Sequence, residues 1–213
     1  MIFHTTFLTL LPLLWLLFEC LVFENEPEPH SVMKKLSIDE LNRKTIEEFK
    51  QSGKLPLVVV LDNVRSLHNI GSIFRTCDAF LIEAIYLCGI SATPPHKEIH
   101  KTALGAEESV EWKYFETALQ AVEHLQTNHY AIWSVEQTQS SVSLENFVIV
   151  HGKRYALVFG NEVRGIEQDV IDRCEGSIEI PQFGTKHSFN VSVSAGIVLW
   201  ECYRKLVAPP LRP

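Results

Sequence analysis

Residues 155–165 read YALVFGNEVRG, an apolar run that stops at a polar turn with glycine at both ends. The apolar run has the length and composition of a buried strand. A helical segment to about Cys174 and a second strand at 177–180 are expected to follow it. Residues 188–196, SFNVSVSAG, then place small and hydroxyl-bearing side chains at the head of an apolar helix. Two strand ends and a helix N-terminus are therefore expected to meet at one crevice, where open α/β sheets bind their ligands.

The rest of the chain continues this alternation of strands and helices. The expected strands are 57–61, 84–88 and 130–135. The expected helices are 37–50, 69–80, 116–126 and 191–206, the first of them starting with a Ser37–Glu40 capping box. Residues 62–68 and 93–106 are expected to be loops, and 144–150 are ambiguous. The alternation predicts βαβ crossovers and hence one α/β domain on a mostly parallel sheet.

A Rossmann-type dinucleotide fold is the default interpretation of this pattern, but the position of the glycines argues against it. That fold predicts a GxGxxG turn after its first strand, where backbone amides meet the cofactor. Here the strand at 57–61 is followed by Asp62-Asn63-Val64-Arg65, which contains no glycine. The glycine-bearing turns lie near the C-terminus, so the ligand site is expected there.

Composition and charge limit the kinds of function. The chain has 213 residues and an ordinary globular composition, which suits one domain with a stable core. Its formal net charge is −7, the wrong sign for binding nucleic acid through the overall field. Residues 1–32 contain four Glu and no Lys or Arg, so removing their −4 leaves −3 for the remainder. An RNA surface must therefore be a local basic patch.

The cysteines and histidines do not form a recognisable metal pattern. The five cysteines are widely spaced without a CxxC pair, and the nine histidines show no HExxH or similar spacing. This argues against a zinc ribbon or a disulfide framework and suits a reducing cytoplasm. We expect no bound metal.

The N-terminal segment allows two interpretations. Residues 5–23 are apolar apart from threonines and Glu19, just long enough for a transmembrane helix, and an acidic linker follows at 24–29. The segment lacks the basic region and the cleavage site of a signal peptide. Because Met33-Lys34-Lys35-Leu36-Ser37 looks like an ordinary start, 1–32 are either an anchor or an upstream extension. We favour the extension and expect a cytoplasmic protein.

Three motifs in order resemble those of the SpoU/TrmH family, RNA 2′-O-ribose methyltransferases that use S-adenosylmethionine. Residues 69–76, NIGSIFRT, are similar to its motif one. Phe159-Gly160-Asn161-Glu162 with Gly165, then Ile180-Pro181, and finally Ser188-Phe189-Asn190-Val191-Ser192 are similar to motifs two and three. The resemblance covers roughly residues 57–206, and three ordered motifs are far more specific than any one of them.

The resemblance implies the SPOUT arrangement, an α/β fold whose mostly parallel sheet is flanked by helices. In that fold the C-terminal segment threads a loop to form a deep trefoil knot. Knots are exceptions to the usual topology rules, so nothing in the periodicity indicates one. We accordingly divide the chain into an N-terminal extension (1–32), a short helical segment (33–56) and a methyltransferase domain (57–208).

The resemblance also assigns the cofactor contacts, to Phe159, Gly160, Ile180 and Phe189. A pocket made largely of main chain suits adenine, and glycine permits close approach. Phe189 stands where the family has an aliphatic residue, but a contact through its backbone would survive that change. The alternative is that Gly160 and Gly165 merely shape a strand-to-helix turn.

Methyl transfer to a ribose hydroxyl is an in-line displacement, in which positioning alone can gain roughly 7–11 kcal/mol. The resemblance makes Arg75 the catalytic arginine and Asn69 its partner. A guanidinium essentially never loses its proton, so a phosphate-paired arginine that orients the hydroxyl is chemically easier than a general base. The alternative is that Arg75 pairs with Asp78 on a solvated helix face.

Three more polar residues belong to the active-site region by resemblance. They are Glu162, Ser188 and Asn190. Each has a structural alternative, because carboxylates near helix N-termini and Ser or Asn at an N-cap are common for purely structural reasons. Candidate RNA contacts are Arg65, His68, His96, His100, Lys101 and His187, for which ordinary solvated surface is the competing interpretation.

The final helix is apolar on more than one face, with Val191, Val193, Ile197, Val198, Trp200 and Leu206. It is either deeply buried or covered by a second chain, and the resemblance implies a homodimer with active sites at the subunit interface. We predict a 2′-O-methyltransferase acting on tRNA or rRNA. Residues 33–56 are too short for the separate RNA-binding domain of some rRNA-specific relatives, which favours tRNA. The alternatives are a catalytically silent RNA-binding or assembly module on the same fold and a membrane-tethered protein.

Overall fold

The computed structural model describes residues 33–37 and 39–207, in two compact units divided after Arg43. The described part of the first unit holds one 3-10 turn, η2 (Asp39–Leu41). The Ser37–Glu40 capping box is present, with the Ser37 N–H donating to Glu40 Oε2 at 2.7 Å. The expectation of one helix over 37–50 is wrong: Asn42 takes a positive φ of 46°, and α2 (Ile46–Gln51) has its own Thr45–Glu48 capping box.

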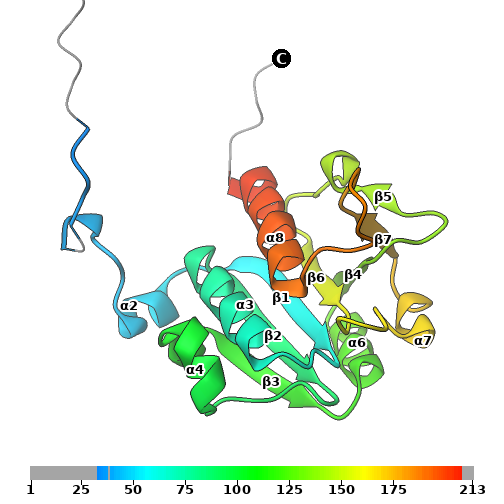
Figure 1. Ribbon diagram of the computed structural model, residues 1–213, viewed down its shortest axis with the longest axis horizontal. Coiled ribbons are helices and arrows are strands. Elements are labelled where there is room, and N and C mark those ends of the chain that lie inside the picture. Colours follow the sequence, from blue (N-terminus) through cyan, green and yellow to red (C-terminus); the bar gives the residue numbers. More distant parts are fainter. Residues whose placement is uncertain (1–32, 38, 208–213) are drawn as a thin grey trace, which may run out of the picture. The chain divides into compact units, whose positions relative to one another are not determined.

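The second unit is built on a seven-stranded sheet in the order β3-β2-β1-β6-β4-β7-β5 (Figure 1). Every strand pair is parallel, which confirms the α/β fold on a parallel sheet. The strands are β1 (Leu55–Asp62), β2 (Ile82–Cys88), β3 (Glu111–Phe115), β4 (Tyr130–Val135), β5 (Val142–Ser143), β6 (Arg154–Phe159) and β7 (Gly176–Glu179). The five strands expected from the apolar runs are all present. The edge strand β3 and the two-residue β5 were not expected.

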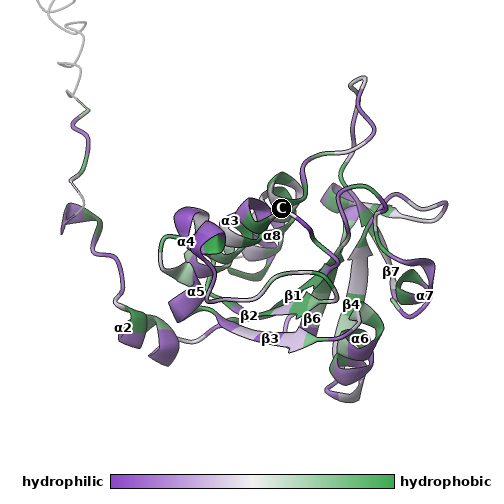
Figure 2. Cartoon of the chain, turned by 60° about the horizontal axis from the view of Figure 1, so that its bottom comes forward, coloured by the Kyte–Doolittle hydropathy of each residue, from purple (hydrophilic) through white to green (hydrophobic). Residues whose placement is uncertain are grey.

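Helices cover both faces of the sheet. They are α3 (Leu67–Ala79), α4 (Lys97–Ala103), α5 (Ala106–Ser109), α6 (Ala118–Thr127), α7 (Gln168–Ile171) and α8 (Val191–Val207). Apolar residues of α3 and α8 belong to one buried cluster and those of α6 to another, and hydrophobic residues are common in the strands (Figure 2). A helical segment was expected to reach about Cys174, but the structure has only the single turn α7 there.

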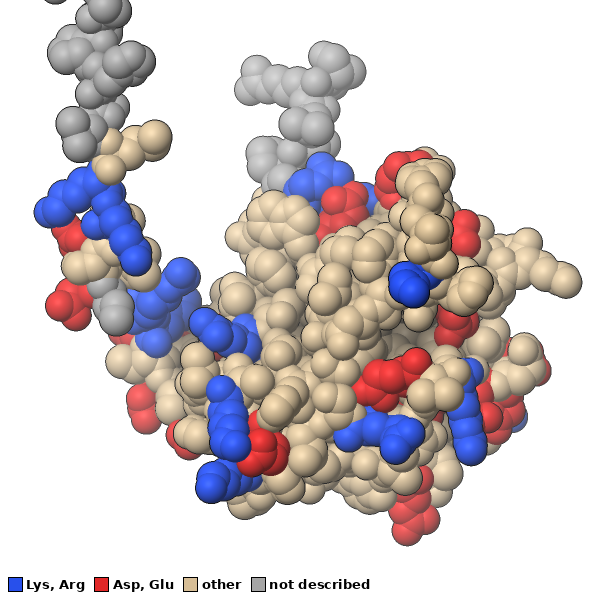
Figure 3. All heavy atoms as spheres, viewed as in Figure 1, with Lys and Arg blue, Asp and Glu red and all other residues tan. Residues whose placement is uncertain are grey.

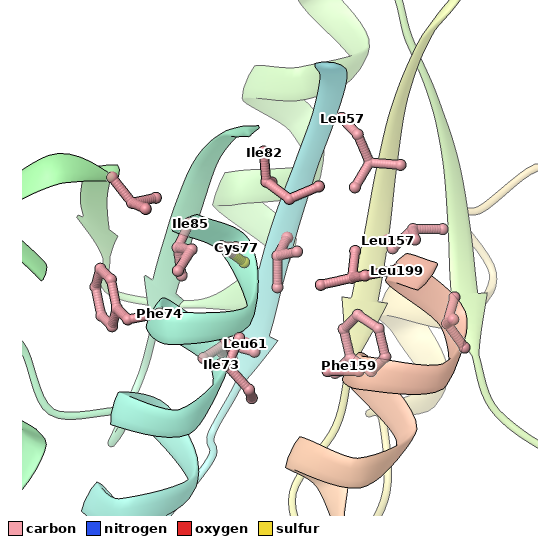
Figure 4. Close-up of a cluster of buried hydrophobic side chains, with 14 of the residues drawn as sticks. Leu57, Leu61, Ile73, Phe74, Cys77, Ile82, Ile85, Leu157, Phe159 and Leu199 are labelled. Carbon is pink, nitrogen blue, oxygen red and sulfur yellow. The ribbon is translucent and has the colours of Figure 1, made fainter. Parts of the chain in front are cut away.

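Alternate residues of the central strands belong to two separate cores. In β1, Leu57, Val59 and Leu61 join the α3 and α8 side chains in one cluster, part of which is drawn in Figure 4. Val58 and Val60 join α6 in the other cluster. Burying one such side chain contributes about 1.5–3 kcal/mol relative to leaving it exposed. This two-faced burial explains why the strand at 57–61 is a continuous apolar run.

The loop expected at 93–106 is wrong, because helices α4 and α5 occupy most of it. Pro94 and Pro95 precede α4 and do not interrupt it. His96 is the N-cap of α4, and its ring accepts the Glu98 N–H at 3.1 Å. α4 then packs against α3 at Gly71, where a Cβ would lie 2.1 Å from Thr102 Oγ1. The motif-one glycine thus has a packing role. No helix among the described residues is long and apolar enough to cross a membrane, and the segment 5–23 lies outside them.

Candidate cofactor and active site

The C-terminal ends of β4, β6 and β7 and the start of α8 surround a cavity of about 410 Å³. All four residues predicted to contact the cofactor line it: Phe159, Gly160, Ile180 and Phe189. Glu162 and Ser188 line it as well. The crevice therefore lies at the sheet edge where the sequence places it, while the role of each residue there stays a prediction.

The motif-two turn folds back on itself beside this cavity. Asn161 and Gly165 exchange two backbone hydrogen bonds, of 3.0 and 2.9 Å, and Asn161 Oδ1 accepts the N–H groups of Val163 and Arg164. A Cβ on Gly160 would lie 2.2 Å from the carbonyl carbon of Gly165. Gly165 itself has a φ of +70°, which favours glycine. Gly160 and Gly165 therefore shape the turn. The contact of Gly160 with the cofactor stays a prediction.

A chain of hydrogen bonds joins the three sequence motifs. Asn69 Nδ2 donates to Glu162 Oε1 at 3.0 Å, and Asn69 Oδ1 accepts from Asn190 Nδ2 at 3.2 Å. The Glu162 carboxylate also accepts the backbone N–H groups of Arg65 and Ser66, at 3.0 and 3.1 Å. Asn190 Oδ1 in turn accepts the N–H and the hydroxyl of Ser192, at 2.9 and 2.7 Å. Asn69, Glu162 and Asn190 are therefore held in one network. The Glu162 carboxylate is also held by two backbone N–H groups.

This network makes part of the protein's stability depend on pH. Partial burial alone would raise the pKa of Glu162, but hydrogen bonds from Arg65, Asn69 and Ser66 outweigh it and hold the pKa below its ordinary value. A depressed carboxyl pKa stabilises the fold above the unfolded-state pKa of about 4.3, and that stability is lost as pH falls through the folded pKa. We expect Glu162→Gln to lower Tm at pH 7.

The difference in Tm between wild type and Glu162→Gln should shrink as the pH is lowered from 7 through about 4, the ordinary pKa of glutamate. Thermal unfolding followed by circular dichroism at a series of pH values measures it. Glu108→Gln, which changes an exposed carboxyl that accepts no hydrogen bond from another described residue, is the control and should move Tm little at any pH. A Tm difference for Glu162→Gln that grows toward acid pH would contradict the assignment.

Arg75 stands apart from this network. It lies on the exposed face of α3, outside the cavity lining, and forms no ion pair with another residue of the described ranges. The alternative pairing with Asp78 is wrong, because Asp78 Oδ1 accepts the Ser109 hydroxyl at 2.5 Å instead. The guanidinium of Arg75 is therefore available to a group from outside this chain.

Two functional candidates, Glu136 and Gln137, were missed by the sequence reasoning. They follow β4 and line the cavity. Glu136 Oε2 accepts the Ile166 N–H at 3.2 Å, and Gln137 Nε2 donates to the His187 carbonyl at 3.2 Å. The two residues after β4 thus form hydrogen bonds with the loop after β6 and with the loop between β7 and α8, both of which line the cavity. A polar pair directly after a buried strand of a parallel sheet was the available signal.

Most of the candidate RNA contacts are engaged by other residues of this chain, and the face drawn in Figure 3 carries scattered residues of both charges. His68 Nε2 and Lys101 Nζ both contact the Glu98 carboxylate, at 3.1 and 2.8 Å. His100 Nδ1 contacts Glu107 at 2.5 Å. Arg65 contributes its N–H to Glu162, and His187 contributes its carbonyl to Gln137. No large patch of one sign is visible on the face drawn, and the RNA roles of these residues stay predictions.

The cavity fits S-adenosylmethionine. Its volume lies in the range of about 300–1,000 Å³ that is usual for small-ligand pockets. Since β7 ends at Glu179 and α8 begins at Val191, the main chain between them lies outside ladder and helix, where it can offer hydrogen-bond groups to adenine. Three carboxylates in the lining, Glu136, Glu162 and Glu179, suit a cationic sulfonium. Within residues 33–37 and 39–207, no group of His, Cys, Asp and Glu is arranged to hold a metal ion.

Comparison with known proteins extends this picture. The model of the SpoU rRNA Methylase family matches residues 56–200. The chain is 30% identical over 175 residues to the tRNA (guanosine(18)-2′-O)-methyltransferase of Aquifex aeolicus, covering 82% of this chain and 81% of that one. It is 32% identical over 152 residues to the 23S rRNA (guanosine-2′-O-)-methyltransferase RlmB of Neisseria meningitidis, covering 71% of this chain but only 60% of that one.

Solved structures agree at the level of the fold. The crystal structure of the A. aeolicus TrmH/SpoU tRNA modifying enzyme superposes with a TM-score of 0.65 at 28% identity, covering 75% of this chain and 79% of that one. An AdoMet-bound rRNA methyltransferase from Sinorhizobium meliloti gives 0.67 at 24% identity, covering 76% and 60%. The motifs, the sheet and the matched region lead to one conclusion: this chain belongs to the SpoU methylase family.

Proposed function

We propose that this protein transfers a methyl group from S-adenosylmethionine to a ribose 2′-hydroxyl of tRNA or rRNA. The observation that carries the proposal is the pair of hydrogen bonds by which the Asn69 amide joins Glu162 and Asn190, and hence all three motifs, beside a cofactor-sized cavity. The named activities of its relatives support it. We favour tRNA, because the chain spans 81% of the Aquifex tRNA enzyme and 60% of the Neisseria rRNA enzyme.

The residues of this chain would act by positioning. S-adenosylmethionine, when bound, supplies the electrophilic methyl group. The main chain around Gly160, Ile180 and Phe189 holds the cofactor, and the Glu136 and Gln137 contacts keep the two flanking loops in place. Arg75 presents a planar fork to an RNA phosphate and thereby orients the neighbouring hydroxyl, since a guanidinium remains charged and does not act as a base.

A homodimer and a knotted C-terminus are part of the same proposal. Val193, Trp200 and Val207 recur every seven residues along α8 and are 48%, 52% and 50% exposed. Tyr203 stacks on Trp200 and Phe80 lies tilted against it, both at ring-centroid distances of 5.8 Å, which extends this apolar surface. A second copy covering it would also fit an arginine that lies outside the cavity of its own chain. The trefoil knot, the domain limits 57–208 and a cytoplasmic location rest on the family resemblance.

The test uses the full chain and a form that starts at Met33, each with tritiated S-adenosylmethionine and total RNA from a strain lacking the gene. Nucleoside mass spectrometry should then find a 2′-O-methyl nucleoside in the tRNA fraction. The same product in rRNA would keep the reaction and change the substrate. Cofactor binding without transfer to either RNA would contradict the proposed acceptor, and absence of both would favour the silent module.

A further inference from the structure

A second cavity adjoins the cofactor cavity. Its volume is about 380 Å³, and it shares four lining residues with the first cavity: Gln137, Glu179, Ile180 and Gln182. The residues peculiar to it include Phe183, Lys186 and His187, from the segment between β7 and α8. Figure 2 shows this segment as a loop that projects away from the sheet and its helices. The family motifs quoted above give Phe183 and Lys186 no role.

Phe183 is the most exposed large apolar side chain among the described residues, at 97%. Single exposed apolar residues are common and by themselves mean little. This ring differs because its loop is anchored on both sides: β7 ends immediately before Ile180-Pro181, and Gln137 Nε2 holds the His187 carbonyl at 3.2 Å. The ring is therefore held beside the cofactor cavity without lining it.

Apart from Ile180 and Pro181, the residues that line the second cavity together with Phe183 are polar. Gln182, Thr185, Lys186 and His187 surround it in sequence, and Lys186 forms no ion pair with any residue in the described ranges. A dimer interface needs a wider apolar patch than one ring with a polar rim. A flat aromatic ring next to a free cation and amide groups is instead the chemistry that binds single-stranded RNA, by base stacking and phosphate attraction.

We propose that Phe183 stacks on a nucleobase of the RNA substrate, at a subsite that opens directly beside the cofactor cavity. Lys186 supplies a positive charge near the adjoining phosphate, and the side-chain amides of Gln137 and Gln182 lie within the same two cavities. This inference rests on the proposed function. The contribution of stacking to RNA affinity does not depend on the overall charge, so it can act in a chain of net charge −7.

The experiment compares Phe183→Ala, Phe183→Leu and Phe183→Trp with the wild-type full chain. The probe is total tRNA from a strain lacking the gene, with RNA affinity measured by filter binding and S-adenosylmethionine affinity by calorimetry. We expect Phe183→Ala and Phe183→Leu to weaken RNA binding about 5- to 150-fold, the range of one base–aromatic stack. Phe183→Trp should bind like wild type, and none should change cofactor affinity. Val148→Ala alters another exposed apolar residue, 75% exposed and outside both cavities, and is the matched control.

Three outcomes would overturn the inference while wild type still methylates RNA. RNA affinity that is equal in wild type, Phe183→Ala and Phe183→Leu would remove the stacking role. A loss confined to S-adenosylmethionine affinity would assign the ring to the cofactor. A change in the oligomer measured by light scattering, without a change in RNA affinity, would assign it to a second copy. Wild-type protein that neither binds nor methylates RNA would instead refute the proposed function, and the inference with it.

Discussion

Arg75→Ala should reduce methyl transfer about 100- to 1,000-fold, the usual effect of removing one preorganised group that stabilises a transition state. The guanidinium is exposed, lies outside the cofactor cavity and makes no ion pair with a described residue, so nothing in the fold depends on it. Affinity for S-adenosylmethionine and Tm should therefore stay at wild-type values. Single-turnover transfer of a tritiated methyl group measures the first effect, and calorimetry measures the others.

Arg75→Lys distinguishes the contribution of the positive charge from that of the planar guanidinium. Arg75→Lys keeps the charge but loses the bidentate fork, so it should recover only part of the rate. Arg173→Ala is the matched control. The ion pair of the Arg173 guanidinium among the described residues is with the exposed Glu123, at 3.6 Å, and this variant should transfer methyl groups normally. Full activity in Arg75→Ala would remove Arg75 from the reaction, and an unfolded variant would assign it a structural role.

Gly160→Ala should weaken S-adenosylmethionine binding and lower methyl transfer by about 100-fold or more, since even a misplacement of about 1 Å can cost that much. The added Cβ would meet the carbonyl carbon of Gly165 at 2.2 Å and the Ile166 nitrogen at 2.4 Å. Both are backbone atoms, and Ile166 is also held by Glu136, so the clash can be relieved only by moving the whole turn. Calorimetric titration with the cofactor measures the loss.

A suitable control is Gly53→Ala, where a Cβ would meet nothing within 4 Å. That variant should bind the cofactor normally. Gly160→Ala should keep the circular dichroism spectrum of the folded wild type, because the change is confined to the turn that follows β6. Wild-type cofactor affinity in Gly160→Ala would show that the turn does not shape the binding site.

The strands that local pattern reveals are the ones buried on both faces. Residues 57–61 and 155–159 are continuous apolar runs because each lies inside the sheet between two cores. β3 was not predicted, because it is an edge strand whose residues, EWKYF, mix charged with aromatic side chains and are exposed or only partly buried. α4 was not predicted, because Pro94-Pro95 indicate a loop. The two prolines lie just before the N-cap of this helix. The strand order depends on long-range pairing, which no local pattern contains.

For the site, too, the sequence indicated some of the residues and not others. Motif resemblance identified Asn69, Glu162 and Asn190, and the structure joins all three by hydrogen bonds. Glu136 and Gln137 fall outside every motif, and their role depends on which loops reach the end of β4 in three dimensions. The roles of the individual site residues in binding and catalysis remain for the variants above to test.

Asn69 bonds to partners that lie 93 and 121 positions further along the chain. During synthesis at about 5–20 residues per second, a ribosome therefore needs roughly 6–24 s after making Asn69 to add Asn190. Through that interval the Asn69 amide has no completed network, and the nascent chain has no active site. The network that joins the three motifs can therefore form only after Asn190 and the start of α8 have left the exit tunnel of the ribosome.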